Sequence, residues 1–371
     1  MSAMQVSIRN DEVVLEGGLT VPGRWLRDHG DDPESLNPDT SQRKVDTFAI
    51  NPEVTPASLA VADGWLQVDW SDGATTGHHL DRLIRVASAP RRPAVRETKG
   101  FTLDPSLELW SDPPPVRWFD AEVINDDGAW VEALDHLRRF GWVAFDGSEL
   151  GDEPLMRLVA RIGYPRRSIF GDVWNMTSGA SEHLDSAYET VALDVHTDGT
   201  YSHDAPGTIV FAQQIKTGEG GDSVLVDAFA AARDFQQLDP DGADLLTRYA
   251  VRGHYIEPGV YLAAERPPLR VGPDGVLEQV SFNNYDRSAV LPEAELVDAV
   301  LDAYAGYRAV FSNPARAIRI PWQPGRLLVV DNWRCFHGRT EFTGDRSFRG
   351  CYTNHEDLEG AYRIAGLIPQ V

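Results

Sequence analysis

Two polar residues, His196 and Asp198, stand at the end of a stretch of alternating apolar residues. Val191, Leu193 and Val195 alternate with small or acidic residues, a pattern that predicts a strand with one buried face. Residues two positions apart on a strand share a face, so the imidazole and the carboxylate leave it together. A histidine and an aspartate side by side can supply two ligands of a metal ion.

A third candidate ligand lies far downstream, where a second apolar strand ends on His337 with Gly338 behind it. Two histidines and one carboxylate form the facial triad of non-haem Fe(II) oxygenases, which leaves positions open for a co-substrate and dioxygen. A single His-x-Asp pair is also common at strand ends without any metal. The matching context of His337 favours the metal site.

Three arginines that follow His337 could bind an organic acid. Arg339, Arg346 and Arg349 come two, nine and twelve positions after it, the last two in a strand-like stretch that would pair beside the His337 strand. An oxygenase of this kind needs an electron source, and the far carboxylate of a 2-oxo acid requires a bidentate arginine. One arginine alone would be a solvated surface charge, whereas three together predict that at least one takes part in the chemistry.

Composition limits the kind of protein that carries this site. The 371 residues, 42% of them hydrophobic, allow one large domain and a small one. The formal net charge of -23 argues against nucleic acid and anionic membrane surfaces as partners. Cys335 and Cys351 are the only cysteines, which excludes a disulfide framework. No segment has the length of a signal peptide core or a membrane span, which predicts a soluble, cytoplasmic protein.

The elements that position the site divide the chain at a proline-rich stretch. Residues 1–95 hold short strand-like pieces between Gly, Asp and Pro turns, which predicts a small β-rich N-terminal domain. Residues 96–117 predict a proline-rich linker. Residues 118–371 predict a mainly β sandwich or jelly roll with some helices. Residues 163–190, which lead into the His196 strand, are expected to form a binding lid or an ordinary surface loop. Helices are expected over residues 130–139, 153–162, 228–238 and 293–313.

The chain resembles the γ-butyrobetaine and trimethyllysine dioxygenases, which are Fe(II)- and 2-oxoglutarate-dependent hydroxylases, over nearly its whole length. The blocks that carry the resemblance are Trp25–His29, Asp185–Tyr188, His196–Asp198, Gly220–Ser223, Asn283–Arg287, Asp331–Arg339 and Arg346–Tyr352. The resemblance implies a double-stranded β-helix (jelly-roll, cupin-like) catalytic domain with iron on His196, Asp198 and His337. It places 2-oxoglutarate at Arg346, helped by Ser223, with Arg349 as the open alternative, and dioxygen as the second co-substrate. It also implies an N-terminal domain packed on the partner of a homodimer.

In the family, a trimethylammonium group lies in an aromatic cage. A quaternary ammonium has no N–H to donate, so the faces of aromatic rings are its natural partners. The matching cage positions are Phe170, Trp174, Tyr188 and Tyr352. Residues expected at the rest of the substrate are Tyr201, Asp185, Asn283, Asn284 and Arg287.

The chain departs from the butyrobetaine branch in two places. That branch often carries zinc on three cysteines and a histidine in the N-terminal domain, but the segment after Asp28 has no thiol, so zinc is not expected. Asp185 stands where the branch has an amide, which argues against a plain carboxylate tail on the substrate. The candidate substrates are ranked as 2-trimethylaminoethylphosphonate first, then γ-butyrobetaine and trimethyllysine.

Three other functions compete with this hydroxylase. The first is an oxygenase of an unrelated small molecule, in which the cage aromatics serve only as core. The second is a non-catalytic binding protein that kept the fold. The third is a zinc hydrolase with the same three ligands, but nothing in the sequence marks a general base positioned to activate water.

Overall fold

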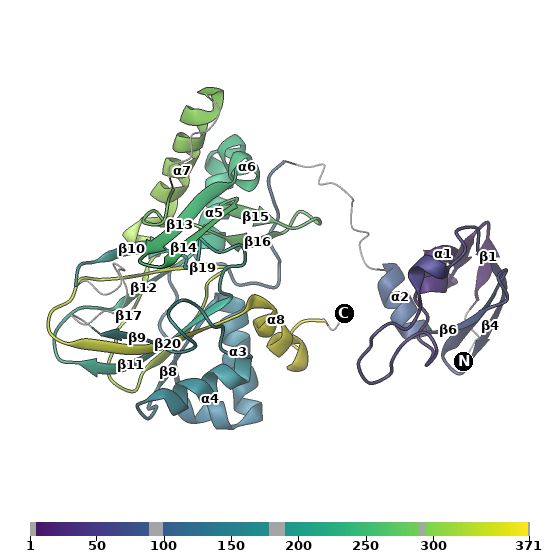
Figure 1. Cartoon of the computed structure of the whole chain (residues 1–371), viewed down its shortest axis with the longest axis horizontal. Helices are drawn as coiled ribbons and strands as arrows, with labels where there is room; N and C mark the ends of the chain where they lie inside the picture. The colour runs from purple at the N-terminus through teal and green to yellow at the C-terminus, as the bar shows by residue number, and fades with distance from the viewer. Residues whose placement is uncertain (1–4, 89–98, 178–189, 289–293, 370–371) are drawn as a thin grey trace. The chain divides into compact units, whose positions relative to one another are not determined.

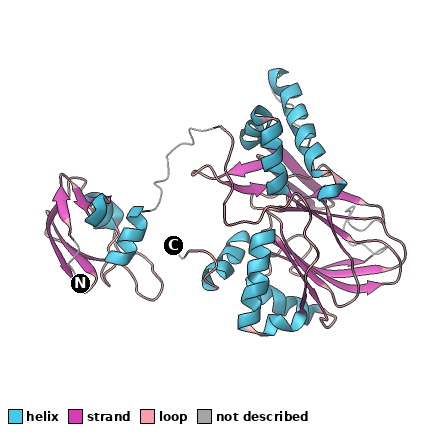
Figure 2. Ribbon diagram, turned by 180° about the vertical axis from the view of Figure 1, so that it is seen from behind, coloured by secondary structure: helices cyan, strands magenta, loops and turns pink. Residues whose placement is uncertain are grey.

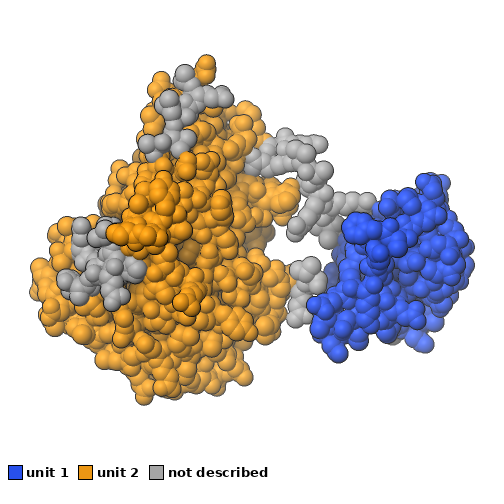
Figure 3. All heavy atoms as spheres, in the orientation of Figure 1, with its two compact units in different colours: residues 1–92 blue, residues 93–371 orange. Residues whose placement is uncertain are grey.

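The structure is a computed structural model of the chain and describes residues 5–88, 99–177, 190–288 and 294–369. By its internal contacts the chain separates into two compact units, residues 1–92 and residues 93–371 (Figure 3). Each unit has a core of its own and is described by itself.

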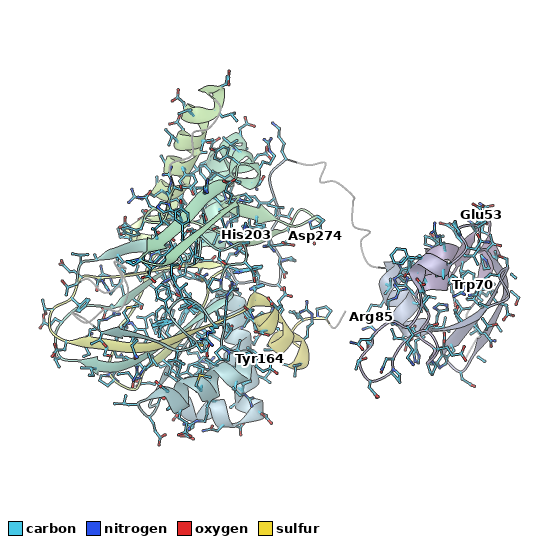
Figure 4. All side chains as sticks on the ribbon, viewed as in Figure 1. Glu53, Trp70, Arg85, Tyr164, His203 and Asp274 are labelled. Carbon is cyan, nitrogen blue, oxygen red and sulfur yellow. The ribbon has the colours of Figure 1, made fainter. Side chains whose placement is uncertain are left out.

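The smaller unit is built from two antiparallel sheets and two helices in its described residues. Alternation along one strand buries Leu66, Val68 and Trp70, which are at most 3% exposed. Trp70, which is labelled in Figure 4, also donates a 2.8 Å hydrogen bond from Nε1 to the hydroxyl of Thr76 on the next strand. The elements are β1 (Ser7–Arg9), β2 (Glu12–Val14), η1 (Glu16–Gly18), β3 (Thr20–Pro22), α1 (Gly23–Asp28), η2 (Thr47–Ala49), β4 (Pro56–Ala62), β5 (Trp65–Trp70), β6 (Thr75–His79) and α2 (Leu80–Ser88).

The larger unit is organised around two sheets with a shared apolar core (Figure 1). In spatial order, a six-stranded sheet runs β7 (Trp118–Asp120), β8 (Trp142–Asp146), β18 (Leu327–Asp331), β11 (Thr208–Lys216), β20 (Arg346–Thr353) and β9 (Trp174–Thr177). A four-stranded sheet runs β10 (Leu193–His196), β19 (Cys335–Arg339), β12 (Ser223–Asp227) and β17 (Ile318–Ile320). The core between them joins Ile209, Leu328 and Val330 of the first sheet to Leu225 and Ile320 of the second.

Helices cover the outer faces of both sheets (Figure 2). The six-stranded sheet packs against α3 (Asp127–Phe140), α4 (Asp152–Ile162) and α8 (His355–Ile364). The four-stranded sheet packs against α5 (Ala228–Leu238), α6 (Pro240–Arg248) and α7 (Val297–Phe311). The remaining elements are η3 (Ala121–Asn125), β13 (Val251–Glu257), β14 (Val260–Arg266), β15 (Leu269–Val271), β16 (Leu277–Val280), η5 (Ala294–Leu296) and η6 (Pro314–Arg316). This two-sheet arrangement with outer helices confirms the mainly β fold class expected for the catalytic part.

Local sequence explains why these helices begin and end where they do. The carboxylate of Asp227 accepts hydrogen bonds from the N–H groups of Phe229 and Ala230 at the start of α5. Helix α3 ends at Gly141, which adopts a left-handed conformation with φ 79°. A Cβ on Gly141 would lie 2.5 Å from Sγ of Cys335, so β19 can approach the end of this helix only at a glycine.

The described part of the proline-rich stretch, residues 99–117, packs on the larger unit. The Trp110 N–H donates to Asp227 at 3.1 Å, and its indole Nε1 donates to the carbonyl of Phe140 at 3.0 Å. The Phe101 N–H donates to Gln236 on α5. The structure thus groups these residues with the catalytic unit, whereas the sequence assigned residues 96–117 to a linker. Backbone hydrogen bonds to the body of the unit hold them there despite their prolines.

Candidate functional site

The three predicted metal ligands meet where two neighbouring strands, β10 and β19, lie side by side. Strands β10 and β19 pair antiparallel, with His196 directly opposite His337, and the two ring centroids lie 4.5 Å apart. Asp198 follows two residues after His196, just beyond the end of β10. One donor atom from each of the three residues falls within 4.8 Å of the others, and no second cluster of this kind occurs among the described residues. This is the juxtaposition that the sequence predicts.

Hydrogen bonding fixes which nitrogen of His196 faces the cluster. Its Nδ1 lies 2.7 Å from the carbonyl of Asp194, and a carbonyl can only accept, so Nδ1 donates and Nε2 keeps its lone pair. Nε2 of His196 lies 3.4 Å from Oδ1 of Asp198, and Nε2 of His337 lies 3.6 Å from the same oxygen. Two imidazole nitrogens and a carboxylate oxygen therefore face one point, which fits a ferrous ion with open coordination positions.

The electrostatics of the cluster favour an ionised Asp198 and a neutral His337. Burial would lower the pKa of His196, but the carboxylate of Asp198 outweighs burial and raises it, so a metal ion at Nε2 of His196 competes with a proton there. Burial alone would raise the pKa of Asp198, but the two imidazoles close to it and the hydrogen bond from the hydroxyl of Tyr352 outweigh burial and hold that pKa well below its usual range. Burial lowers the pKa of His337 to about 4, despite the opposing charge of Asp198. Asp198 is thus ionised and His337 neutral at neutral pH.

The loop that carries Asp198 is bonded on several sides. Thr197 donates its N–H to the carbonyl of Phe282 at 2.8 Å and accepts from the Phe282 N–H through its hydroxyl at 3.0 Å. Gly199 has φ 74°, and a Cβ there would lie 2.6 Å from the ring of Pro206. The guanidinium of Arg266 donates to the carbonyl of Gly199. The ligand loop is therefore preorganised by the protein.

A cavity of about 120 Å³ opens on the metal cluster. It brings together residues from both sheets and from the segment after β16. Of the residues predicted to bind co-substrate or substrate, the following line it: Phe170, Trp174, Tyr201, Ser223, Asn283, Arg346 and Tyr352.

One side of the cavity carries buried arginines. Arg346 on β20 is 7% exposed and lines the cavity, while Arg349 turns to the other side of the strand and forms a 2.9 Å ion pair with Asp152. The hydroxyl of Ser223 accepts a 2.9 Å hydrogen bond from Trp322 and can still donate its own proton to a ligand. Arg339, which is 5% exposed, also lines the cavity.

Arg339 was one of the three arginines that could bind an organic acid, but the sequence did not give it a role of its own in the site. It follows His337 by two positions on β19. The period-two argument that pairs His196 with Asp198 could therefore have placed it on the face of its metal ligand.

Aromatic rings form another wall of the cavity. The ring centroids of Trp174 and Tyr352 lie 6.0 Å apart, and Trp174 also meets Phe211 edge-on at 5.7 Å. Trp174 lies against the backbone of Gly350, where a Cβ would come within 2.0 Å of two atoms of its ring. Aromatic faces around a small space are suited to a quaternary ammonium group.

Two of the predicted substrate residues lie elsewhere in the structure. Asn284 lines a second cavity of about 200 Å³ beside α7 and not the metal cavity. The guanidinium of Arg287 stacks over the ring of Tyr304 at 4.8 Å and does not line the metal cavity. Both residues therefore lie away from the metal cavity in this structure, and their role at the substrate stays a prediction. Asp185 and Tyr188 lie outside the described residues.

Asp286 lines the cavity, although it was not among the residues predicted from the sequence. Its carboxylate accepts hydrogen bonds from the hydroxyl of Thr200 at 2.7 Å and from the amide of Asn283 at 3.0 Å. Residues 283–287 form no regular strand, so alternation could not indicate which of them face inward. The acidic side chain within the Asn283–Arg287 block was the available signal.

Comparisons with known proteins agree with this geometry. The family model described as taurine catabolism dioxygenase TauD, TfdA family, matches residues 111–352. The mitochondrial trimethyllysine dioxygenases of Rattus norvegicus and Homo sapiens are each 30% identical over 359 residues, which cover 92% of this chain and 82% of theirs. The γ-butyrobetaine dioxygenase of Pseudomonas sp. strain AK-1 is 24% identical over 339 residues, covering 90% of this chain and 87% of its own.

Two further observations concern the described residues outside the cavity. None of their helices combines the length and apolar character of a membrane span. In the segment where the butyrobetaine branch often carries zinc, the Asp32 carboxylate accepts from the N–H groups of Ser35 and Gly77. The expected absence of zinc stays a prediction.

The metal cluster, the buried arginines beside it and the matches over most of the chain lead to one assignment. The protein belongs to the TauD/TfdA family and is a 2-oxoglutarate-dependent dioxygenase with His196, Asp198 and His337 grouped to bind iron.

Proposed function

We propose that this dioxygenase hydroxylates a small compound that bears a trimethylammonium group. The observation that carries the proposal is the position of Trp174 and Tyr352, whose rings line the same cavity of about 120 Å³ as the metal cluster. A quaternary ammonium held against those rings would bring its neighbouring carbons close to the metal. The names of the trimethyllysine and γ-butyrobetaine relatives support the same substrate class.

The chain's residues give the co-substrate a defined orientation. We assign the far carboxylate of 2-oxoglutarate to Arg346, with Ser223 as a second donor, because both are buried and line the cavity. Arg339 adds a second positive charge to the same cavity. When iron, 2-oxoglutarate and dioxygen are bound, they supply the oxidising chemistry, which releases CO2 and succinate as a C–H bond is hydroxylated. The protein's part is to orient the reactants and to exclude water.

The charged residues of the cavity indicate which group the substrate carries at the end opposite its trimethylammonium group. Asp286 and Asn283 line it in addition to the arginines that the co-substrate needs. The carboxylate of Asp286 attracts an ammonium group and repels a phosphonate. Trimethyllysine carries an α-ammonium group, whereas 2-trimethylaminoethylphosphonate, ranked first from the sequence, carries only negative charge at that end. We therefore favour trimethyllysine, with γ-butyrobetaine and the phosphonate as the alternatives.

The direct test measures succinate release under air with ferrous salt and each of the three candidate compounds. Trimethyllysine is expected to stimulate 2-oxoglutarate turnover most and to yield one hydroxylated product by mass spectrometry. His337→Ala serves as the control that lacks a metal ligand. Stimulation by the phosphonate alone would overturn the tail assignment but keep the substrate class.

A second measurement separates the alternatives of other classes. Trp174→Leu is expected to weaken binding of trimethylammonium ligands, because it removes a ring face from the cavity. Unchanged affinity in this variant would favour an oxygenase of an unrelated molecule. A protein that binds these ligands but releases no succinate with any of them would be a binding protein of this fold.

The organisation of the whole protein enters the same proposal. We infer a homodimer and a separate N-terminal domain over residues 1–95 from the family resemblance, and a cytoplasmic protein from the composition. Analytical ultracentrifugation of the full chain tests the dimer, and a monomer at micromolar concentration would refute it.

A further inference from the structure

The two oxygens of the Asp198 carboxylate have different surroundings. Oδ1 lies 3.4 Å from Nε2 of His196 and 3.6 Å from Nε2 of His337. Oδ2 accepts a 2.8 Å hydrogen bond from the hydroxyl of Tyr352. That bond engages Oδ2 and fixes the rotation of the carboxylate, so Oδ1 is the oxygen presented to a cation between the two imidazoles.

The backbone of Asp198 is held separately, by the side chain of Asn332. Oδ1 of Asn332 accepts from the Asp198 N–H at 2.9 Å. Its Nδ2 donates to the carbonyl of Asp198 at 3.1 Å and to the carbonyl of Pro206 at 2.9 Å. Asn332 is 1% exposed and lies in the turn between β18 and β19. One amide therefore ties the loop of one metal ligand to the strand that carries another, His337.

Tyr352 belongs to the aromatic wall as well as to the surroundings of the metal. It lies on β20, its ring lines the cavity, and its centroid is 6.0 Å from that of Trp174. A phenol ring is rigid, so a ligand that shifts its face also moves the hydroxyl bonded to Asp198. A ligand against the ring can thereby act on the metal ligand without touching it.

We propose that Asn332 and Tyr352 are positioning residues for Asp198, and that Tyr352 transmits occupancy of the aromatic wall to this metal ligand. The positioning role of Asn332 and Tyr352 concerns how tightly the protein binds iron. The transmitting role of Tyr352 rests on the proposed function, because it takes a trimethylammonium group as the occupant. The consequence is that the iron site responds to occupancy of the aromatic wall through the hydroxyl of Tyr352.

The test uses Tyr352→Phe, which keeps the ring and removes the hydroxyl, in the full chain without oxygen. Tyr261→Phe is the matched control, because Tyr261 is 67% exposed on β14. Ferrous sulfate is titrated into the apoprotein, and tetramethylammonium is then titrated by calorimetry. For Tyr352→Phe we expect the iron dissociation constant to rise about tenfold, as when a residue that orients a metal ligand is removed. Tetramethylammonium affinity should stay within about twofold, because the ring face remains.

The coupling has its own readout. Iron and 2-oxoglutarate together give a visible absorption band without oxygen, and tetramethylammonium is expected to shift it in the wild type and in Tyr261→Phe but not in Tyr352→Phe. Under air, Tyr352→Phe is expected to release more succinate per hydroxylated product. A wild-type iron affinity in Tyr352→Phe would overturn the positioning role, and a band shift of wild-type size would overturn the coupling.

Asn332→Asp tests the backbone clamp with a side chain of the same shape. The substitution replaces the amide NH2 group, which donates to the carbonyls of Asp198 and Pro206, by a carboxylate oxygen that those carbonyls repel. We therefore expect the iron dissociation constant to rise about ten- to a hundredfold. Asn313→Asp, at an exposed helix start where aspartate also caps, is its control. Iron binding like that of the wild type in Asn332→Asp would overturn the clamp. The iron titrations contain no organic ligand, so their outcome does not depend on the identity of the substrate. A wild-type protein that does not bind tetramethylammonium would contradict the proposed function but would leave the results of the iron titrations unchanged.

Discussion

Two arginines on β20 have different surroundings because they lie on opposite faces of the strand. Arg346 and Arg349 are three residues apart on β20, so their side chains leave opposite faces of the strand. Arg346 is buried at the cavity, whereas Arg349 pairs with Asp152 at the other face. An ion pair that is partly solvated contributes little to function or stability.

Lysine in place of each arginine should therefore have very different effects. Arg346→Lys removes the planar fork that a carboxylate needs, and we expect the KM for 2-oxoglutarate to rise about tenfold or more. Arg349→Lys should leave it within about twofold, since its partner is a surface carboxylate. Succinate formation at varied 2-oxoglutarate measures both, and equal effects in the two variants would contradict the assignment.

Gly350 offers a second test at the scale of one residue. A Cβ added there would come within 2.0 Å of two atoms of the Trp174 ring, so the ring would have to move. Gly350→Ala should weaken tetramethylammonium binding about tenfold, because the displaced ring no longer faces the cation.

Gly360→Ala is the matched control for that substitution. Gly360 lies within α8, with nothing within 4 Å of the added Cβ. It should bind tetramethylammonium normally and gain about 0.5–1 kcal/mol of stability from helix propensity. Calorimetry measures the affinity for tetramethylammonium, and urea unfolding measures the stability. Normal tetramethylammonium binding by Gly350→Ala would show that the aromatic wall does not depend on the contact between Gly350 and Trp174.

At the scale of elements, a buried ion pair ties β19 to the elements around it. Arg334 is 2% exposed and donates to Asp227 at 2.8 Å, to the carbonyl of Arg139 at the end of α3 and to the carbonyl of Glu108. Asp227 in turn begins α5. The strand that carries His337 is thus anchored to α3, to α5 and to the segment before β7.

Removal of this arginine should destabilise the larger unit strongly. Arg334→Ala leaves the Asp227 charge buried without its guanidinium, which costs about 3–5 kcal/mol. Lys99→Ala, which breaks an exposed pair with Asp241, should change stability by less than about 1 kcal/mol. Urea unfolding followed by circular dichroism measures both, and a loss below 1 kcal/mol for Arg334→Ala would refute the anchoring role.

In the smaller unit, a buried histidine predicts a dependence of stability on pH. His78 is 1% exposed, and Nε2 of its ring lies 2.8 Å from the hydroxyl of Thr76, which also accepts a hydrogen bond from Trp70. Burial lowers the pKa of His78 to about 4. The unfolded state, with a pKa near 6.5, binds more protons between these values, so stability is complete above about pH 6.5 and is lost as pH falls towards 4.

The expected loss between pH 7.5 and pH 5 is about 2 kcal/mol from this group. Urea unfolding at the two pH values measures it, with an NMR titration of the His78 ring protons as the direct check. His78→Gln should reduce the pH dependence by that amount, whereas exposed His203→Gln should keep it. An NMR pKa of His78 near 6.5 would contradict the prediction.

At the scale of the whole molecule, the chain has two compact units, and among the described residues the cluster of His196, Asp198 and His337 lies in the larger one. A ligand that binds the folded state alone stabilises it by mass action, by about 2.7 kcal/mol at one hundred times its dissociation constant. Ferrous iron without oxygen should therefore raise the unfolding temperature of the larger unit. The smaller unit should not respond.

Scanning calorimetry of the full chain with iron, and again after a chelator, tests this expectation. The stabilisation should vanish with the chelator and in His337→Ala, which lacks one ligand. A shift of equal size in His337→Ala would mean that the iron binds elsewhere.

Local patterns in the sequence were sufficient for four helices of the larger unit and for the metal ligands, but not for helices α6 and α8. Helix α5 begins and ends at the residues expected, Ala228 and Leu238, because a capping aspartate and an alanine-rich run are local signals. Strand alternation was sufficient to select His196 and Asp198, although β10 ends at His196 and Asp198 lies in the loop that follows. The context of His337 was sufficient to choose it.

Contacts between distant segments decided the rest. Which face of β20 meets the cavity depends on its two neighbours β11 and β9, so Arg346 and Arg349 could not be told apart beforehand. The segment from Asn283 to Arg287 has no repeating geometry, so only its packing showed that Asp286 faces the cavity and Arg287 does not. The bonds from Asn332 and Tyr352 to Asp198 span 134 and 154 residues. Local sequence fixes side-chain alternation and helix ends, but such long-range bonds exist only once the two sheets have closed around the site.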